Sequence, residues 1–65
     1  MLSQSWTVNK TWTVVGYTLV LGQLVSLIGT VLRQEYVEMK FAVNGALHVK
    51  IVAISDLEAH CTPIT

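Results

Sequence analysis

The chain has few charged residues and one cysteine, and both shortages exclude some classes of function. Charged residues make up 12% of the 65 residues, against roughly 25% in an average globular protein, and four basic side chains balance four acidic ones. A chain without net positive charge does not attract polyanions over a distance, which counts against strong nucleic-acid binding. The one cysteine, Cys61, excludes an internal disulfide and a Cys-x-x-Cys zinc pair. We therefore expect a reducing compartment and a cytoplasmic protein.

Catalytic and metal-binding groups of residues are also missing. His48 has no partner of a suitable kind nearby, and neighbouring His60 and Cys61 point apart in an extended segment. Ser55 and Asp56 lie within six residues of His60, which is too local for a hydrolase triad around an oxyanion site. We predict no catalytic residue, no metal ligand and no cofactor, and hence a protein that is not an enzyme.

Hydrophobic residues, by contrast, make up 52% of the chain. A domain of this size buries only about 60% of the surface that its unfolded chain exposes, so self-association would stabilise it. We predict one small domain over residues 1–65 and a homodimer. Trp6-Thr-Val and Trp12-Thr-Val repeat a β-prone unit, and residues 1–11 are expected to form an N-terminal arm or an extra strand.

Residues 36–54 carry the clearest structural pattern. Apolar side chains alternate with polar or small ones on both sides of Asn44-Gly45, and a period of two marks strands with one buried face. The apolar positions are Val37, Met39 and Phe41 before the turn and Leu47, Val49 and Ile51 after it. We therefore predict a β-hairpin that buries both apolar sets.

The loop length of this hairpin decides which side chains are buried. A two-residue loop would pair Phe41 with His48 and mix apolar and polar side chains on one face. A three-residue loop that begins at Val43 pairs Phe41 with Leu47 instead. It also places Gly45 where a left-handed residue is favoured. We predict the three-residue loop.

Residues 14–32 carry no charge and can be interpreted in two ways. Their number meets the roughly 18 to 20 uncharged residues that a membrane-spanning helix needs, with Trp12 and Tyr36 near the ends. This interpretation gives a single-pass membrane protein with a span at about residues 13–32, acting as a small accessory or oligomeric subunit.

The second interpretation divides the stretch into strands. Gly16, Gly22 and Gly29 interrupt it every six or seven residues, and the pieces between them have strand length and strand-forming composition. Gln23 would be costly inside a bilayer but is ordinary in a turn. A lone hairpin is marginally stable and needs further strands over its apolar face. We favour this all-β interpretation.

The end of the chain contains a helix signal. Ser55 and Glu58 have the spacing of a capping box, which predicts a short helical turn through about His60. Pro63 prevents a longer helix. Residues 61–65 are then a frayed end or a short edge strand.

The order of these segments resembles that of SH3-like small barrels, in which a single helical turn precedes the last strand. The resemblance covers about residues 15–62. It uses a strand at Gly22-Gln-Leu-Val25, a turn at Gly29-Thr-Val31, the Asn-Gly hairpin and Asp56-Leu57-Glu58. It implies an all-β barrel of about four or five strands with a short C-terminal helical turn.

A second resemblance is to the carbon storage regulator family of small dimeric RNA-binding translational regulators. Residues 15–22, Val-Gly-Tyr-Thr-Leu-Val-Leu-Gly, are similar to that family's Val-Gly-Glu-Thr-Leu-x-Ile-Gly segment, and residues 30–32, Val43-Asn44 and Val49 are similar to later strands. This resemblance implies RNA binding. Residues 53–55 are Ala-Ile-Ser where the family has the Arg-Glu-Glu that contacts RNA, so no RNA-binding residue is carried over.

The candidate binding residues are Trp6, Trp12, Arg33 and Tyr36. Aromatic residues and arginine dominate contact hot spots, and they stack on nucleic-acid bases. A structural alternative places Trp12 in the core and Trp6 at a dimer seam. We predict a small non-catalytic binding module with a regulatory or adaptor role, engaging a protein partner or RNA.

Overall fold

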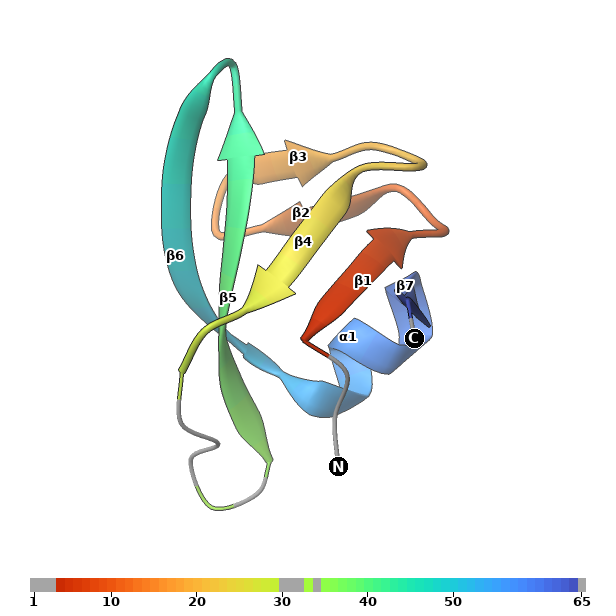
Figure 1. Cartoon of the computed structure of the whole chain (residues 1–65), viewed down its shortest axis with the longest axis vertical. Coiled ribbons are helices and arrows are strands. Elements are labelled where there is room, and N and C mark those ends of the chain that lie inside the picture. The colour runs from red at the N-terminus through yellow and green to blue at the C-terminus, as the bar shows by residue number, and fades with distance from the viewer. Residues whose placement is uncertain (1–3, 30–32, 34, 65) are drawn as a thin grey trace.

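The computed structural model describes residues 4–29, 33 and 35–64, which form seven strands and one short helix (Figure 1). One antiparallel sheet has the strand order β6-β5-β4-β1-β7, and β2 and β3 form a second, two-stranded sheet. The strands are β1 (Ser5–Val8), β2 (Trp12–Val14), β3 (Tyr17–Leu19), β4 (Leu24–Leu27), β5 (Tyr36–Val43), β6 (Ala46–Ala53) and β7 (Cys61–Ile64), and the helix is α1 (Ile54–His60). The prediction of a mostly β chain with a short helix near its end is confirmed.

The prediction of a closed barrel is wrong for the described strands. β6 and β7 lie at opposite ends of the five-stranded sheet, so this sheet stays open. The reason lies in the pairing of the last strand. Helix α1 leads away from β6, and β7 then pairs with β1, with Cys61 opposite Val8. The β2–β3 hairpin lies behind β4 in Figure 1 and covers the sheet instead of closing it.

The described part of the uncharged stretch folds as strands and turns, as its glycine spacing predicts. Gly16 and Gly22 have φ values of +85° and +82°, a region that favours glycine, and each lies in a turn next to β3. Gln23 fixes the second turn, because its Oε1 accepts a hydrogen bond from the Val20 N–H (3.1 Å) and its Nε2 donates to the Ala42 carbonyl (2.6 Å). Within the described residues, no helix is long and apolar enough to cross a bilayer. Residues 30–32 lie outside the described part.

The β5–β6 hairpin turns through two residues, so the predicted three-residue loop is wrong. Asn44 and Gly45 have φ values of +53° and +79°, as a type I′ turn requires. Phe41 therefore pairs with His48, where the prediction placed Leu47.

A residue from a distant strand makes this register possible. Tyr17 of β3 covers the inner face of the hairpin, with its ring centroid 4.1 Å from that of His48 and 5.9 Å from that of Phe41. The Lys50 ammonium lies 5.9 Å from the Tyr17 centroid. The His48 ring thus packs on the Tyr17 ring at the margin of the core, and the Lys50 ammonium lies within cation–π distance of the same ring. In consequence, the apolar side chains that alternate with them on β6 point outward.

The core lies between the two sheets and against α1. Its buried side chains are Trp6, Val8, Trp12, Val14, Leu19, Val25, Val37, Met39, Phe41, Val52, Leu57 and Cys61. The N-terminal segment contributes the extra strand β1, which pairs with both β4 and β7 and therefore belongs to the middle of the sheet.

Helix α1 begins at Ile54, one residue before the predicted cap. Its N-cap residue is Ala53, which makes no side-chain capping bond, so the predicted Ser55 capping box is wrong. The Ile54 N–H instead donates to the Glu35 carbonyl (2.8 Å), which ties the start of the helix to the segment before β5. Leu57 anchors the helix in the core, and the residues after it form the short edge strand β7.

Candidate binding site

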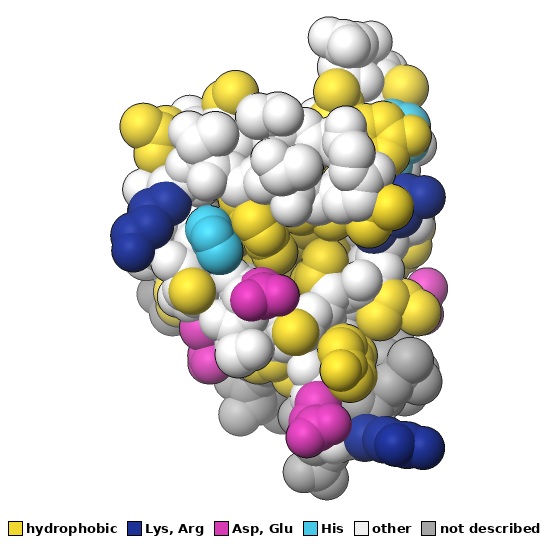
Figure 2. Space-filling view, turned by 180° about the vertical axis from the view of Figure 1, so that it is seen from behind, with side chains coloured by type: hydrophobic (Ala, Val, Ile, Leu, Met, Phe, Trp, Pro, Cys, Tyr) yellow, Lys and Arg dark blue, Asp and Glu magenta, His cyan; other side chains and the backbone are white. Residues whose placement is uncertain are grey.

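A hollow of about 370 Å³ opens between the β2–β3 hairpin and the junction of β6 with α1. We name it the aromatic hollow. It is lined by Trp12, Thr13, Val14, Val15, Tyr36, Ile51, Val52, Ala53 and Asp56. Figure 2 shows this face of the molecule, with hydrophobic side chains at the bottom of a recess and acidic side chains at and below its lower edge.

The floor of the aromatic hollow is apolar and held in place from behind. Trp12, Val14 and Val52 line it and are buried. The Trp12 indole stacks on the His60 imidazole with 4.9 Å between ring centroids and 5° between planes. His60 Nδ1 in turn donates to the Asp56 carbonyl oxygen (2.8 Å). Helix α1 therefore fixes the indole before any ligand arrives.

The rim of the aromatic hollow carries groups that solvent reaches. The Tyr36 side chain is 43% exposed, and Asp56 is exposed in the first turn of α1. Val15 is 69% exposed and lies in the turn between β2 and β3. A bound side chain would thus meet an apolar floor, a phenol and a carboxylate.

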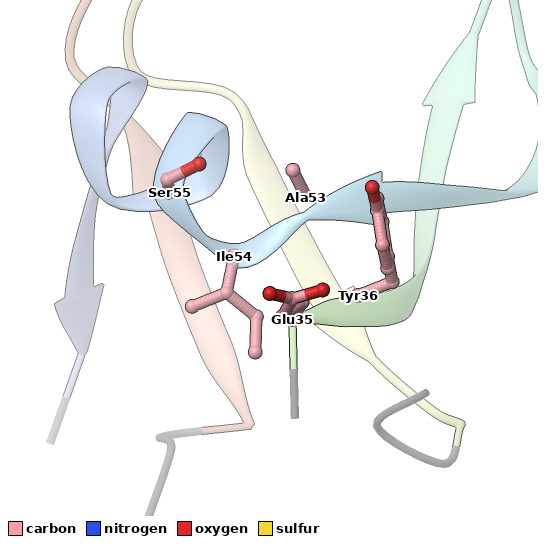
Figure 3. A pocket seen from close by; sticks show the side chains of 5 residues that line it. All are labelled: Glu35, Tyr36, Ala53, Ile54 and Ser55. Carbon is pink, nitrogen blue, oxygen red and sulfur yellow. The ribbon is translucent and has the colours of Figure 1, made fainter. Parts of the chain in front are cut away.

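A second hollow of about 400 Å³ adjoins the first, because Tyr36 and Ala53 line both. Figure 3 shows its lining: Glu35 directly precedes β5 and Tyr36 begins it, whereas Ala53, Ile54 and Ser55 come from the junction of β6 with α1. The hydrogen bond from Ile54 to Glu35 joins these two segments. We name this the Glu35 hollow.

The two hollows together are acidic. Asp56 lines the aromatic hollow and Glu35 lines its neighbour, and the described residues that line either one include no lysine or arginine. The surface therefore favours a cation beside an apolar group and disfavours phosphate.

The structure brings two of the four predicted binding residues together. Trp12 and Tyr36 line the same hollow although they are distant in sequence. Trp6 is 4% exposed and belongs to the core of its own chain, so its ring is offered neither to a ligand nor to a dimer seam. Arg33 is exposed between β4 and β5 and lines neither hollow.

Sequence reasoning missed Asp56 as a site residue. In the sequence alone, the acidic residues near the helix are explained as local helix signals. It is the pairing between β5 and β6 that brings Asp56 near Tyr36. A usable signal was present: Tyr36 begins β5 and Ala53 ends β6, and strands of a hairpin begin and end at the same side of a sheet. The residues just before the first strand and just after the second strand of a hairpin therefore lie close together.

The described residues hold no group of three or more His, Cys, Asp or Glu side chains that could bind a metal ion. Burial raises the pKa of the Cys61 thiol from 9.0 to about 11, so this side chain stays protonated at neutral pH and is a poor nucleophile.

Comparison of the chain with protein-family models, with curated proteins and with solved structures finds no match.

Proposed function

We propose that the protein is a small non-catalytic binding module that engages a partner protein through the aromatic hollow. The partner would offer an exposed segment with an apolar side chain next to a lysine or arginine. The observation that carries this proposal is the combination of a preformed apolar floor, made by Trp12 and Val52, with the Asp56 carboxylate on the rim. Pockets of this kind supply affinity through the apolar contact and orientation through the polar group.

A protein partner suits this surface better than RNA. Aromatic rings stack on bases, but an RNA strand brings a phosphate for every base, and Asp56 and Glu35 would repel those phosphates. The four basic residues are spread over the chain, and Lys50 lies over Tyr17 on the other side of β6 from the exposed row of apolar side chains. We keep RNA as an outcome of the test.

The fold proposal is an SH3-like strand arrangement without closure. It is supported by α1 directly preceding the last strand, β7, and by the two-residue hairpin between the two longest strands. Both features agree with the resemblance described above.

The test is a panning experiment in which random linear peptides displayed on phage are selected on the full chain. We expect enriched peptides to contain an aromatic or large aliphatic residue close to a lysine or arginine. Asp56→Asn should weaken an enriched synthetic peptide about threefold, the strength of a solvated ion pair, and Tyr36→Ala about tenfold, the strength of a contact hot spot.

The matched control for Asp56→Asn is Glu58→Gln. Both changes remove one carboxylate from α1, but Glu58 does not line either hollow. Equal effects of the two variants would indicate a general charge effect and contradict the proposal. Binding of a single-stranded RNA pool that weakens steeply with salt and is indifferent to Tyr36→Ala would also contradict it.

A further inference from the structure

Strand β6 ends the five-stranded sheet, and it presents a long unpaired edge. It has eight residues and pairs with β5 alone among the described strands. In a hairpin with a two-residue loop, the residues that flank the loop form a hydrogen-bonded pair. Val43 and Ala46 are that pair, so alternate residues of β6 from Ala46 onward direct their N–H and C=O groups toward β5. The groups of Leu47, Val49 and Ile51 therefore point to the free edge.

The side chains of these three residues are exposed as well. Leu47, Val49 and Ile51 are 68%, 44% and 54% exposed and lie on the outer face of the sheet. Natural sheets usually protect an edge with short strands, proline, bulges or charged side chains, including charged side chains that point inward. In β6 the one charged side chain, Lys50, points to the inner face, where its ammonium lies over the Tyr17 ring of the same chain. Open backbone groups and exposed apolar side chains thus coincide on the same three residues.

We propose that two copies of the chain pair through β6, antiparallel and about a two-fold axis at Val49. The two sheets would then form one continuous sheet. Val49 would exchange two hydrogen bonds with Val49 of the second copy, and Leu47 would exchange two with Ile51 at each side. On the outer face the same pairs form an apolar ladder across the junction. The proposal does not depend on the aromatic hollow, with which the β6 edge shares one residue, Ile51.

The side chains select this register over its neighbours. A two-fold axis perpendicular to the sheet must place one residue of β6 opposite the same residue of the second copy. An axis at Lys50 would therefore set two ammonium groups against each other. An axis at His48 would leave Ile51 opposite Gly45, which has no side chain to cover it. The axis at Val49 pairs apolar with apolar on the outer face and Lys50 with His48 on the inner face.

The same argument identifies the occupant as a second copy. Leu47 and Ile51 are equally spaced on both sides of Val49, so the strand is complementary to itself, as a two-fold interface requires. The opposite edge strand of the sheet, β7, has four residues and contains Pro63, and it does not offer this symmetry.

The first measurement is sedimentation velocity of the full chain over a wide range of concentrations. We expect a concentration-dependent dimer. Val49→Lys places two like charges at the axis and should weaken the dimer by more than about tenfold, because like charges directly opposite each other destabilise strand pairing. The matched control is Leu21→Lys, which introduces the same charge at a side chain that is 64% exposed in a turn outside β6.

A second variant separates backbone pairing from side-chain contact. Val49→Pro removes an N–H that faces solvent in the single chain, so the β5–β6 ladder is retained while the edge is blocked. It should abolish the dimer and leave the circular dichroism spectrum β-like. Where this variant does not fold, the Val49→Lys result decides.

Isotope-filtered nuclear Overhauser spectra of a mixed labelled and unlabelled sample test the register. The axis at Val49 makes His48 and Lys50 of opposite copies a non-hydrogen-bonded pair, whose Hα atoms lie close together. An interchain Hα contact between these two residues supports the proposal. A monomer at every concentration, a Val49→Lys dimer as strong as the wild type, or a dimer without that contact would overturn it.

Discussion

The two edge strands of the five-stranded sheet, β6 and β7, differ in how well they are protected from pairing with another strand. β7 has four residues, contains Pro63, and begins with the buried Cys61 beside helix α1. β6 has eight residues, contains no proline, and exposes three large apolar side chains on its outer face. Proline and short length protect an edge from pairing, whereas a long apolar edge invites it. The comparison teaches that β7 is anchored by the core of its own chain and that β6 is available to another strand.

The largest expected effect breaks the β7 side of this comparison. Leu57 is fully buried in α1, which leads directly into β7. Leu57→Ala should lower the free energy of unfolding by about 2–5 kcal/mol, because it removes buried methyl groups and leaves a cavity. Val49→Ala on β6 should change it by less than about 0.5 kcal/mol in dilute solution, since its side chain is exposed. Urea denaturation at low protein concentration measures both, and similar losses would contradict the contrast.

A smaller effect depends on pH and again concerns β7. The Cys61 thiol has its pKa raised from 9.0 to about 11 by burial. Above pH 9 the unfolded chain loses this proton while the folded chain keeps it, so stability falls as the pH rises. We expect a loss of about 2 kcal/mol on approaching the higher pKa. Urea titrations across this range should show a shallower decline for Cys61→Ala, and equal slopes for both proteins would refute the assignment.

The smallest effect sharpens the β6 side, through the turn that sets its register. Gly45 has a φ of +79°, so Gly45→Ala should cost about 1 kcal/mol of unfolding free energy. Asn44→Asp is the control, because both residues tolerate the left-handed conformation. The ring current of Tyr17 on the His48 protons reports whether the register persists. Asn44→Asp should keep the turn and therefore the ring-current shift of the His48 protons. Loss of that shift in this variant would contradict the assigned role of the turn.

The sequence predicts strand positions well because local composition decides them. The two Trp-Thr-Val units form β1 and β2, and the glycine spacing locates the turns on both sides of β3. The short helix and the final edge strand are also found where expected. Each of these features depends on residues that are close together in the chain.

The hairpin register could not be predicted from alternation alone. From the sequence alone, the pairing of apolar residues with His48 and Lys50 on one face looks unfavourable. In the structure, Tyr17 from the other sheet covers both His48 and Lys50. The same limit applies to the site. Trp12 and Tyr36 were candidates because of their type, but their meeting at one hollow with Asp56 depends on pairing between distant strands. Trp6 has the same residue type and is buried in the core.

The position of β1 has a consequence for how the chain folds during synthesis. β1 is made early, yet it lies between β4 and β7, and its residue Val8 pairs with Cys61. The local β5–β6 hairpin can form as soon as residues 36–53 have left the ribosome. The sheet is complete only after β7 has emerged, so one side of β1 stays unpaired until residues 61–64 are available. Pairing across such a separation is slow, which makes Trp6 a late reporter of the native state.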